Sequence, residues 1–159
     1  MIAVAILGIL TGIMIVGFGG QTRKVKTTSE ANAMFAEVHR AQSQYALEHG
    51  VYFSTGDDDG DIFPTTPTST SQDVGTVPDE WDTLRLKATS PKLYCGYVTV
   101  AGTADDDIPT FAEDFGMEQP ETNWYVVYAR CNADGNTAVD AEYFTSSFDN
   151  SLQKRNDGR

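Results

Sequence analysis

The chain has 159 residues and a formal net charge of −12, from 11 basic and 23 acidic side chains. This length supports one domain with a modest core. Residues 1–50 carry four basic and three acidic side chains, a net +1, so residues 51–159 carry −13. Such an acidic segment repels phosphate backbones and anionic lipids, which argues against nucleic-acid binding.

The first 18 residues, MIAVAILGILTGIMIVGF, form an apolar run without a charge or a proline. A helix rises about 1.5 Å per residue, so this run would span roughly 27 Å, close to the thickness of a bilayer's hydrocarbon core. It lacks the basic start and the cleavage site of a secretory signal peptide. We therefore expect residues 1–20 to form a retained hydrophobic helix.

The helical pattern continues beyond residue 20 with a different character. Apolar side chains recur at steps of three and four, namely Ala31, Met34, Phe35, Val38, Ala41 and Tyr45. This spacing predicts one buried stripe on an amphipathic helix over residues 21–50, and Gly50 supplies its stop. The sequence thus predicts one long helix over residues 1–50 and a globular head over residues 51–159.

The head begins with a segment, residues 51–91, that is typical of a variable loop. It contains the acidic run GDDDGD at 56–61 and the proline-rich run PTTPTSTS at 64–71. Serine, threonine and proline at this density do not form a core. We expect Trp81, Leu84 and Leu86 to fix the far end of this loop against the rest of the head.

Three strands are predicted in residues 92–145, because residues 92–101, 123–131 and 137–145 are rich in aromatic and β-branched side chains. The sequence NADGN at 132–136 predicts a tight hairpin between the last two strands. Residues 102–121 are interpreted as an insertion, and residues 146–159 as a C-terminal tail. The predicted fold class is α+β, with the long N-terminal helix packed on a C-terminal antiparallel sheet.

Two cysteines, Cys95 and Cys131, lie on the first two predicted strands. An apolar export segment with an even cysteine count favours a disulfide in an oxidising compartment. For the enclosed loop, chain entropy predicts a stabilisation of roughly 3–4 kcal/mol. Two free thiols are the alternative, and no CxxC or Cys–His spacing indicates a metal site.

Two oxygen-rich turns offer candidate ligands for calcium. They comprise Asp57, Asp59 and Asp61 in the first turn, and Asn132, Asp134, Asn136 and Asp140 in the second. The first turn does not complete the EF-hand pattern, because no acidic residue follows at the required distance. We interpret both as solvated turns, keep calcium as the alternative, and predict no cofactor.

Catalytic signals are weak in this chain. The only two histidines, His39 and His49, both fall on the long predicted helix. There is no serine elbow and no glycine-rich phosphate loop, and the many carboxylates lie in loops where nothing desolvates them. We predict that the protein is not an enzyme.

The sequence MIAVAILGILTGI at residues 1–13 closely resembles the N-terminal helix of type IV pilins and of type II secretion pseudopilins, including the glycine at Gly8. The order of long helix, variable loop, antiparallel strands and two late cysteines is also similar. The tryptophan before YCGYVTVAG and the NADGN turn resemble pilins of the myxobacterial sort. The family's leader, its methylated phenylalanine and its glutamate would lie upstream of Met1, and Val16 stands where many pilins have a proline.

This resemblance implies the pilin αβ-roll fold and a structural subunit of a helical extracellular filament. The implied partners are further copies of the chain, the inner-membrane assembly machinery and, before assembly, the membrane itself. The implied location is the inner membrane and then a pilus on a Gram-negative-type cell surface. A type II secretion pseudopilin or a minor pilin is one alternative, and a membrane-anchored binding module that does not polymerise is another.

Particular residues of the apolar run carry this expectation. The filament-core residues would be Ile2, Val4, Ile6, Leu7, Gly8, Ile9, Leu10, Gly12, Ile13, Ile15 and Val16. Gly8 and Gly12 form a small-xxx-small pair that suits close helix approach. In the resembled family the helix often melts within filaments, and the candidates for such melting here are Gly12, Gly17, Gly19 and Gly20.

Overall fold

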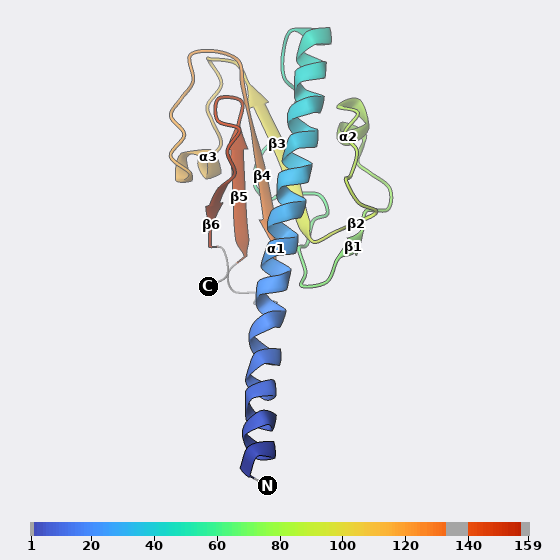
Figure 1. Ribbon diagram of the computed structural model, residues 1–159. Coiled ribbons are helices and arrows are strands. Elements are labelled where there is room, and N and C mark those ends of the chain that lie inside the picture. Colours follow the sequence, from blue (N-terminus) through green and yellow to red (C-terminus); the bar gives the residue numbers. More distant parts are fainter. Residues whose placement is uncertain (1, 133–139, 157–159) are drawn as a thin grey trace.

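The computed structural model describes the backbone of residues 2–132 and 140–156, and the side chains of residues 24–132 and 140–156. Helix α1 spans Ile2–His49. Its first half extends away from the head, and its second half lies along a sheet (Figure 1). The other elements are β1 (Gln72–Asp73), α2 (Asp79–Thr83), β2 (Lys92–Leu93), β3 (Cys95–Gly102), α3 (Thr110–Asp114), β4 (Trp124–Cys131), β5 (Ala141–Ser146) and β6 (Gln153–Arg155). The predicted α+β class, with a long helix and an antiparallel sheet, is confirmed.

The main sheet has four antiparallel strands in the order β3-β4-β5-β6, and β1 pairs with β2 in a separate two-stranded ribbon. Along the strands, successive side chains point to opposite faces. The odd-numbered side chains of β3 and β4, such as Tyr97 and Val127, join the core cluster that includes α1. The even-numbered ones, such as Val98 and Val126, join a second cluster on the opposite face. Both faces of the sheet are therefore covered.

The first face of the sheet is covered by α1. The predicted stripe residues Ala31, Met34, Phe35, Val38 and Ala41 are all buried, and Tyr45 packs against the same cluster. The helix stops as predicted, because Gly50 adopts a positive φ of 79° and its amide donates to the Ala46 carbonyl at 2.8 Å. A positive φ costs glycine little, which is why this residue suits the end of a helix.

The second face is covered by the segment interpreted from sequence as an insertion. Its helix α3 places the ring of Phe111 4.9 Å from that of Tyr128. Phe115, which follows α3, stacks on Phe144 with ring centroids 4.9 Å apart. The insertion is thus a packed layer of the head, and its apolar side chains complete the second core.

The free edge of β3 is covered by the loop that follows α1. Three amides of β3 point away from β4 and donate to this loop. The Tyr97 amide donates to the Phe63 carbonyl at 2.9 Å. The Thr99 amide donates to Thr55 Oγ1 at 3.1 Å, and the Ala101 amide donates to Ser54 Oγ at 2.8 Å. The Thr99 carbonyl in turn accepts from the Thr55 amide at 2.8 Å. The backbone groups on this edge therefore already have partners.

Several short elements differ from the sequence-based expectation. The predicted strand 92–101 is divided at Tyr94, so that β2 pairs with β1 and only β3 pairs with β4. The loop 51–91 contains β1 and α2, while Trp81, Leu84 and Leu86 are buried as predicted. The expected tail, 146–159, supplies the edge strand β6. Most of the hairpin at 132–136, and the start of the predicted strand 137–145, lie outside the described residues.

Candidate functional site

The candidate site is the face of α1 that packs on the head, together with the open groove where α1 leaves the head. This region connects the apolar run to the folded head. Polar side chains of α1 that lie on or beside the buried stripe make the specific contacts. They are Thr27, Glu30, His39 and Gln42, and each bonds a group on the sheet or its edge loop. We call these four residues the docking residues.

Glu30 is held where β2 meets β3. Its Oε1 accepts from the amides of Tyr94 at 2.9 Å and Cys95 at 3.0 Å, and from the phenol of Tyr97 at 2.9 Å. Burial raises the pKa of Glu30, and the three donors oppose that rise without cancelling it. Burial and the Glu30 charge together raise the pKa of Tyr97 well above its ordinary value, so the phenol stays a donor.

His39 bridges α1 to strands β4 and β5. Its Nδ1 lies 2.5 Å from the Tyr125 hydroxyl and its Nε2 lies 3.2 Å from Thr145 Oγ1. The Thr145 hydroxyl donates its proton to the Asp149 carbonyl at 2.9 Å, so it accepts from His39. The geometry therefore assigns the proton to Nε2, while Nδ1 accepts from Tyr125. Burial lowers the pKa of His39 and raises that of Tyr125 to about 12, in agreement with a neutral ring and a protonated phenol.

Gln42 connects α1 to the loop that covers the β3 edge. This fully buried side chain accepts from the Phe53 amide at 3.0 Å and donates to the Phe53 carbonyl at 2.6 Å and to Thr99 Oγ1 at 3.1 Å.

At the end of the head where α1 leaves it, the hydroxyl of buried Tyr143 lies 3.2 Å from Thr28 Oγ1 and 3.4 Å from Thr27 Oγ1. The docking residues thus fix the helix in register along its buried length.

The predicted disulfide is confirmed. Cys95 and Cys131 are opposite each other in the β3–β4 register, with Cα atoms 4.2 Å apart. This spacing is typical of a non-hydrogen-bonded pair, in which the amides point away from the partner strand. The Cys95 amide is consequently free to bond Glu30, so the disulfide and the carboxylate secure the same end of β3.

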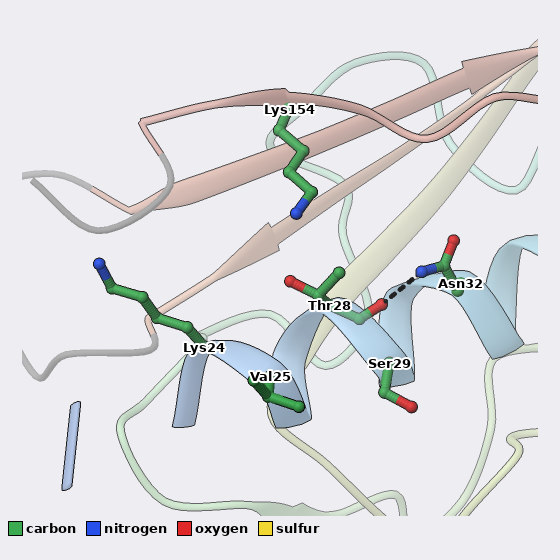
Figure 2. Close-up of a pocket in the computed structure, with 6 residues that line it drawn as sticks. All are labelled: Lys24, Val25, Thr28, Ser29, Asn32 and Lys154. Carbon is green, nitrogen blue, oxygen red and sulfur yellow. Dashed lines mark hydrogen bonds between the residues drawn. The ribbon is translucent and has the colours of Figure 1, made fainter. Parts of the chain in front are cut away.

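An open groove lies where α1 leaves the head (Figure 2). It has a volume of about 470 Å³ and is lined by Lys24, Val25, Thr28, Ser29 and Asn32 of α1 and by Lys154 of β6. Figure 2 shows the Lys154 side chain extending from β6 towards α1. The described lining residues include two lysines, Lys24 and Lys154, and both make further interactions within the chain.

The predicted filament-core residues and the melting candidates fall in the first half of α1. The backbone is helical from Ile2 onward, including residues 17–20, but the side chains of residues 1–23 lie outside the described ones. Among the side chains that the structure does describe, no helix is both long and apolar enough to cross a membrane. The membrane and filament-core assignments of residues 1–20 therefore remain predictions.

Two of the calcium candidates, Asp61 and Asp140, have other contacts. Asp61 Oδ2 accepts from the amides of Asp57 at 2.8 Å and Asp58 at 3.4 Å, which closes a turn. Asp140 Oδ2 lies 3.7 Å from Arg130 Nε, while Asp134 and Asn136 lie outside the described residues. Within residues 24–132 and 140–156, no three His, Cys, Asp or Glu side chains gather as a metal site requires.

Sequence reasoning did not single out the docking residues as a group. The signal was present, because Glu30 precedes Met34 by four residues and Gln42 follows Val38 by four. Polar residues at these steps share the face of the buried stripe. A polar side chain on such a face needs a partner, which could have indicated that Glu30 and Gln42 bond the head.

The comparisons with known proteins give no family for this chain: no family model matches it, and neither the curated proteins nor the solved structures contain a match.

Proposed function

We propose that this protein is a structural subunit of a type IV pilus-like helical extracellular filament, which enters the filament from a membrane pool through its N-terminal helix. The observation that carries the proposal is the length of α1. This helix has 48 residues; its second half lies along the head, and the backbone of its first half extends away from it (Figure 1). The extended half coincides with the uncharged apolar run of residues 1–18.

Burial energetics support packing of this run among other copies. Burying a Leu, Ile or Val side chain contributes about 1.5–3 kcal/mol relative to water. Nine such residues therefore supply roughly 15–25 kcal/mol per subunit; they are Ile2, Val4, Ile6, Leu7, Ile9, Leu10, Ile13, Ile15 and Val16. Because lipid is also apolar, transfer from a bilayer to a helix bundle changes the free energy far less. Subunits could thus wait in the membrane and be moved into a filament by assembly machinery.

The head supports the same proposal by the way it holds α1. A subunit in a fibre must carry load between its helix and its head, and the docking residues join these two parts by directional hydrogen bonds. A single long helix on a four-stranded antiparallel sheet is also the general arrangement of the pilin αβ-roll. Each added copy would use a heterologous contact that does not close, which yields a fibre in place of a ring.

The test is to shear fibres from native cells that express the full chain and to image them by cryo-electron microscopy. We expect the density of this head to repeat along the fibre, with the apolar helices of many copies at the centre. A repeat in every subunit would assign a major pilin, whereas presence only at a tip or in a periplasmic assembly would assign a minor pilin or a pseudopilin. Detection of the chain only as membrane-bound monomers would overturn the proposal.

A further inference from the structure

The edge strand β6 carries an arginine whose surroundings show how this head binds a guanidinium group. The guanidinium carbon of Arg155 lies 5.0 Å from the centre of the Phe115 ring. Its Nη1 lies 3.0 Å from Asp114 Oδ2, and its Nε donates to Glu142 Oε2. One aromatic ring and two carboxylates thus surround one arginine, which combines cation–π attraction with charge-assisted hydrogen bonds.

A second ring with two carboxylates lies nearby in an open depression of about 350 Å³. This depression is lined by Glu118, Pro120, Glu121, Thr122 and Phe148, and we call it the Phe148 depression. Both carboxylates are exposed, and no basic side chain is among the lining residues. Within residues 24–132 and 140–156, neither Glu118 nor Glu121 uses its carboxylate in a hydrogen bond or an ion pair. The groups that bind Arg155 therefore recur here without an arginine.

The ring of Phe148 is held exposed by an ordered turn between β5 and β6. The amides of Phe148 and Asp149 donate to Ser146 Oγ at 3.3 and 3.1 Å, and the Ser146 amide donates to the Asp149 carbonyl at 3.0 Å. Among the described side chains, four large hydrophobic ones are exposed, and Phe148, at 58%, is the aromatic one. Aromatic side chains are enriched in interfaces, and a backbone that is already ordered lowers the entropic cost of binding.

The backbone on the carboxylate side of the Phe148 depression is also fixed. Gln119 follows Glu118, and its Nε2 donates to the Asp106 carbonyl at 2.8 Å. Its Oε1 accepts from the Ile108 amide at 3.2 Å. These bonds tie the segment that carries the carboxylates to the start of the insertion, so both walls of the depression are formed before a partner arrives.

An apolar depression of about 370 Å³ adjoins the Phe148 depression and shares Glu118 and Phe148 with it. Its lining includes the side chains of Phe115, Met117 and Phe144, and no basic side chain. The two depressions therefore form one surface, with a place for a cation beside a place for an apolar side chain.

The chemistry of this surface favours an arginine from another protein. A guanidinium group stacks on rings and forms paired bonds with carboxylates, which an ammonium group does less well. Four arginines of this chain have described side chains, and each lies within 4 Å of a carboxylate; they are Arg40, Arg85, Arg130 and Arg155. A second copy would have to give up one of these ion pairs to fill the depression, whereas the net charge of −12 attracts a basic partner.

We propose that the Phe148 depression binds an arginine of a partner protein, with the guanidinium on the Phe148 ring and between Glu118 and Glu121. An apolar side chain next to that arginine occupies the adjoining depression. The partner is thus a protein with an exposed basic segment in which an arginine and an apolar residue are neighbours. This surface belongs to the head alone, so it does not depend on whether the chain forms a filament.

The test is to titrate the nitrogen-15-labelled full chain, in nonionic detergent, with the peptide acetyl-Gly-Arg-Leu-Gly-amide and to follow the amide signals by NMR. We expect shifts confined to residues 115–122 and 146–149. A peptide with lysine in place of arginine should bind about two- to fivefold more weakly, because it loses most of the stacking on the ring. A peptide with glycine in place of leucine should also bind more weakly, because the adjoining depression stays empty.

Two variants test the residues themselves. F148L keeps an apolar side chain without the ring, and E118Q/E121Q keeps the shape without the charges. Each should weaken binding of the arginine peptide by about threefold or more. The matched control is D79N/E80N, which removes two exposed charges from α2, on the opposite flank of the head from α3 (Figure 1). This control should leave binding unchanged.

Three outcomes would overturn the proposal. The first is the absence of shifts at millimolar peptide. The second is equal binding of the arginine and lysine peptides, or equal weakening by E118Q/E121Q and D79N/E80N, since overall charge alone would then explain binding. The third is self-association of the chain that F148L abolishes, without peptide binding, which would assign the surface to a second copy. None of these outcomes bears on the imaging of fibres, so the filament proposal is tested separately.

Discussion

The Glu30 carboxylate on α1 accepts the phenolic proton of Tyr97 on β3 at 2.9 Å, across 67 positions of sequence. The same oxygen accepts from the Tyr94 and Cys95 amides. One side chain therefore joins the helix to the start of the sheet at the point where the disulfide also closes. The integrity of this junction determines whether the head keeps its orientation on the helix.

Replacement of Glu30 by alanine should destabilise the head by about 2–4 kcal/mol, because three buried donors lose their acceptor. Replacement by glutamine should cost less, since one oxygen can still accept from Tyr94, Cys95 and Tyr97. Urea unfolding of the full chain in detergent, followed by the fluorescence of buried Trp81 and Trp124, measures both effects. Equal destabilisation by the two substitutions would contradict this account of the carboxylate.

The contribution of His39 to the stability of the head should fall as the pH is lowered from about 6.5, in the range between the unfolded and folded pKa of His39. The folded pKa lies below the ordinary value because burial disfavours the charged ring. The unfolded state therefore binds more protons in this range, so stability rises with pH there and is fully present above the unfolded pKa. Protonation would also place a second donor opposite the Tyr125 hydroxyl.

The matched variant for this pH effect is His39→Gln, which cannot take up a proton. The difference in unfolding free energy between the original chain and His39→Gln should shrink as the pH falls from 7 to 5. Contributions from Glu30 are common to both proteins and cancel in the difference. A difference that stays constant with pH would show that His39 keeps the same protonation state in folded and unfolded chains.

Removal of the disulfide by the double substitution Cys95→Ala and Cys131→Ala should lower the free energy of unfolding by roughly 2–4 kcal/mol, mainly because the unfolded chain gains freedom. Alanine is chosen because both positions are buried, and serine would add an unsatisfied hydroxyl. Thermal unfolding with and without reductant provides the measurement. The reductant should shift the melting temperature of the original chain and leave that of the double variant unchanged.

Substitution of Gly102 by alanine should destabilise the head by about 1–3 kcal/mol through overpacking. An added Cβ would lie 2.5 Å from Trp124 Cζ2, and the indole cannot retreat easily because its Nε1 donates to the Thr103 carbonyl at 2.7 Å. Near-ultraviolet circular dichroism and urea unfolding would detect the displaced ring. An unchanged spectrum and stability would mean that β3 shifts to accept the methyl group.

The parts of the fold that follow from local pattern were predictable. The stripe from Ala31 to Tyr45 and the stop at Gly50 both depend on spacing along one helix. The strand containing Trp124–Cys131 could be recognised from its β-branched and aromatic residues, and the even cysteine count indicated a disulfide. Each of these signals is contained in a short stretch of sequence and requires no knowledge of its partner.

The rest depends on partners that are distant in sequence. Glu30 and Gln42 are polar, and only their contacts with Tyr97 and Phe53 explain why they lie on the buried side of α1. The strands β1 and β6 have two and three residues, too few for a periodic pattern. Similarly, the insertion became a layer of the head because Phe111 and Phe115 meet rings on β4 and β5.

The covered edge of β3 constrains how copies of this protein could join. Since loop 51–63 already occupies that edge, a neighbouring chain cannot extend the sheet there without first displacing the loop. Copies joined by helix packing and side-chain contacts would have no main-chain β-sheet hydrogen bonds across the interface between them. A fibre assembled in this way could release its subunits one at a time, intact, and take them back again.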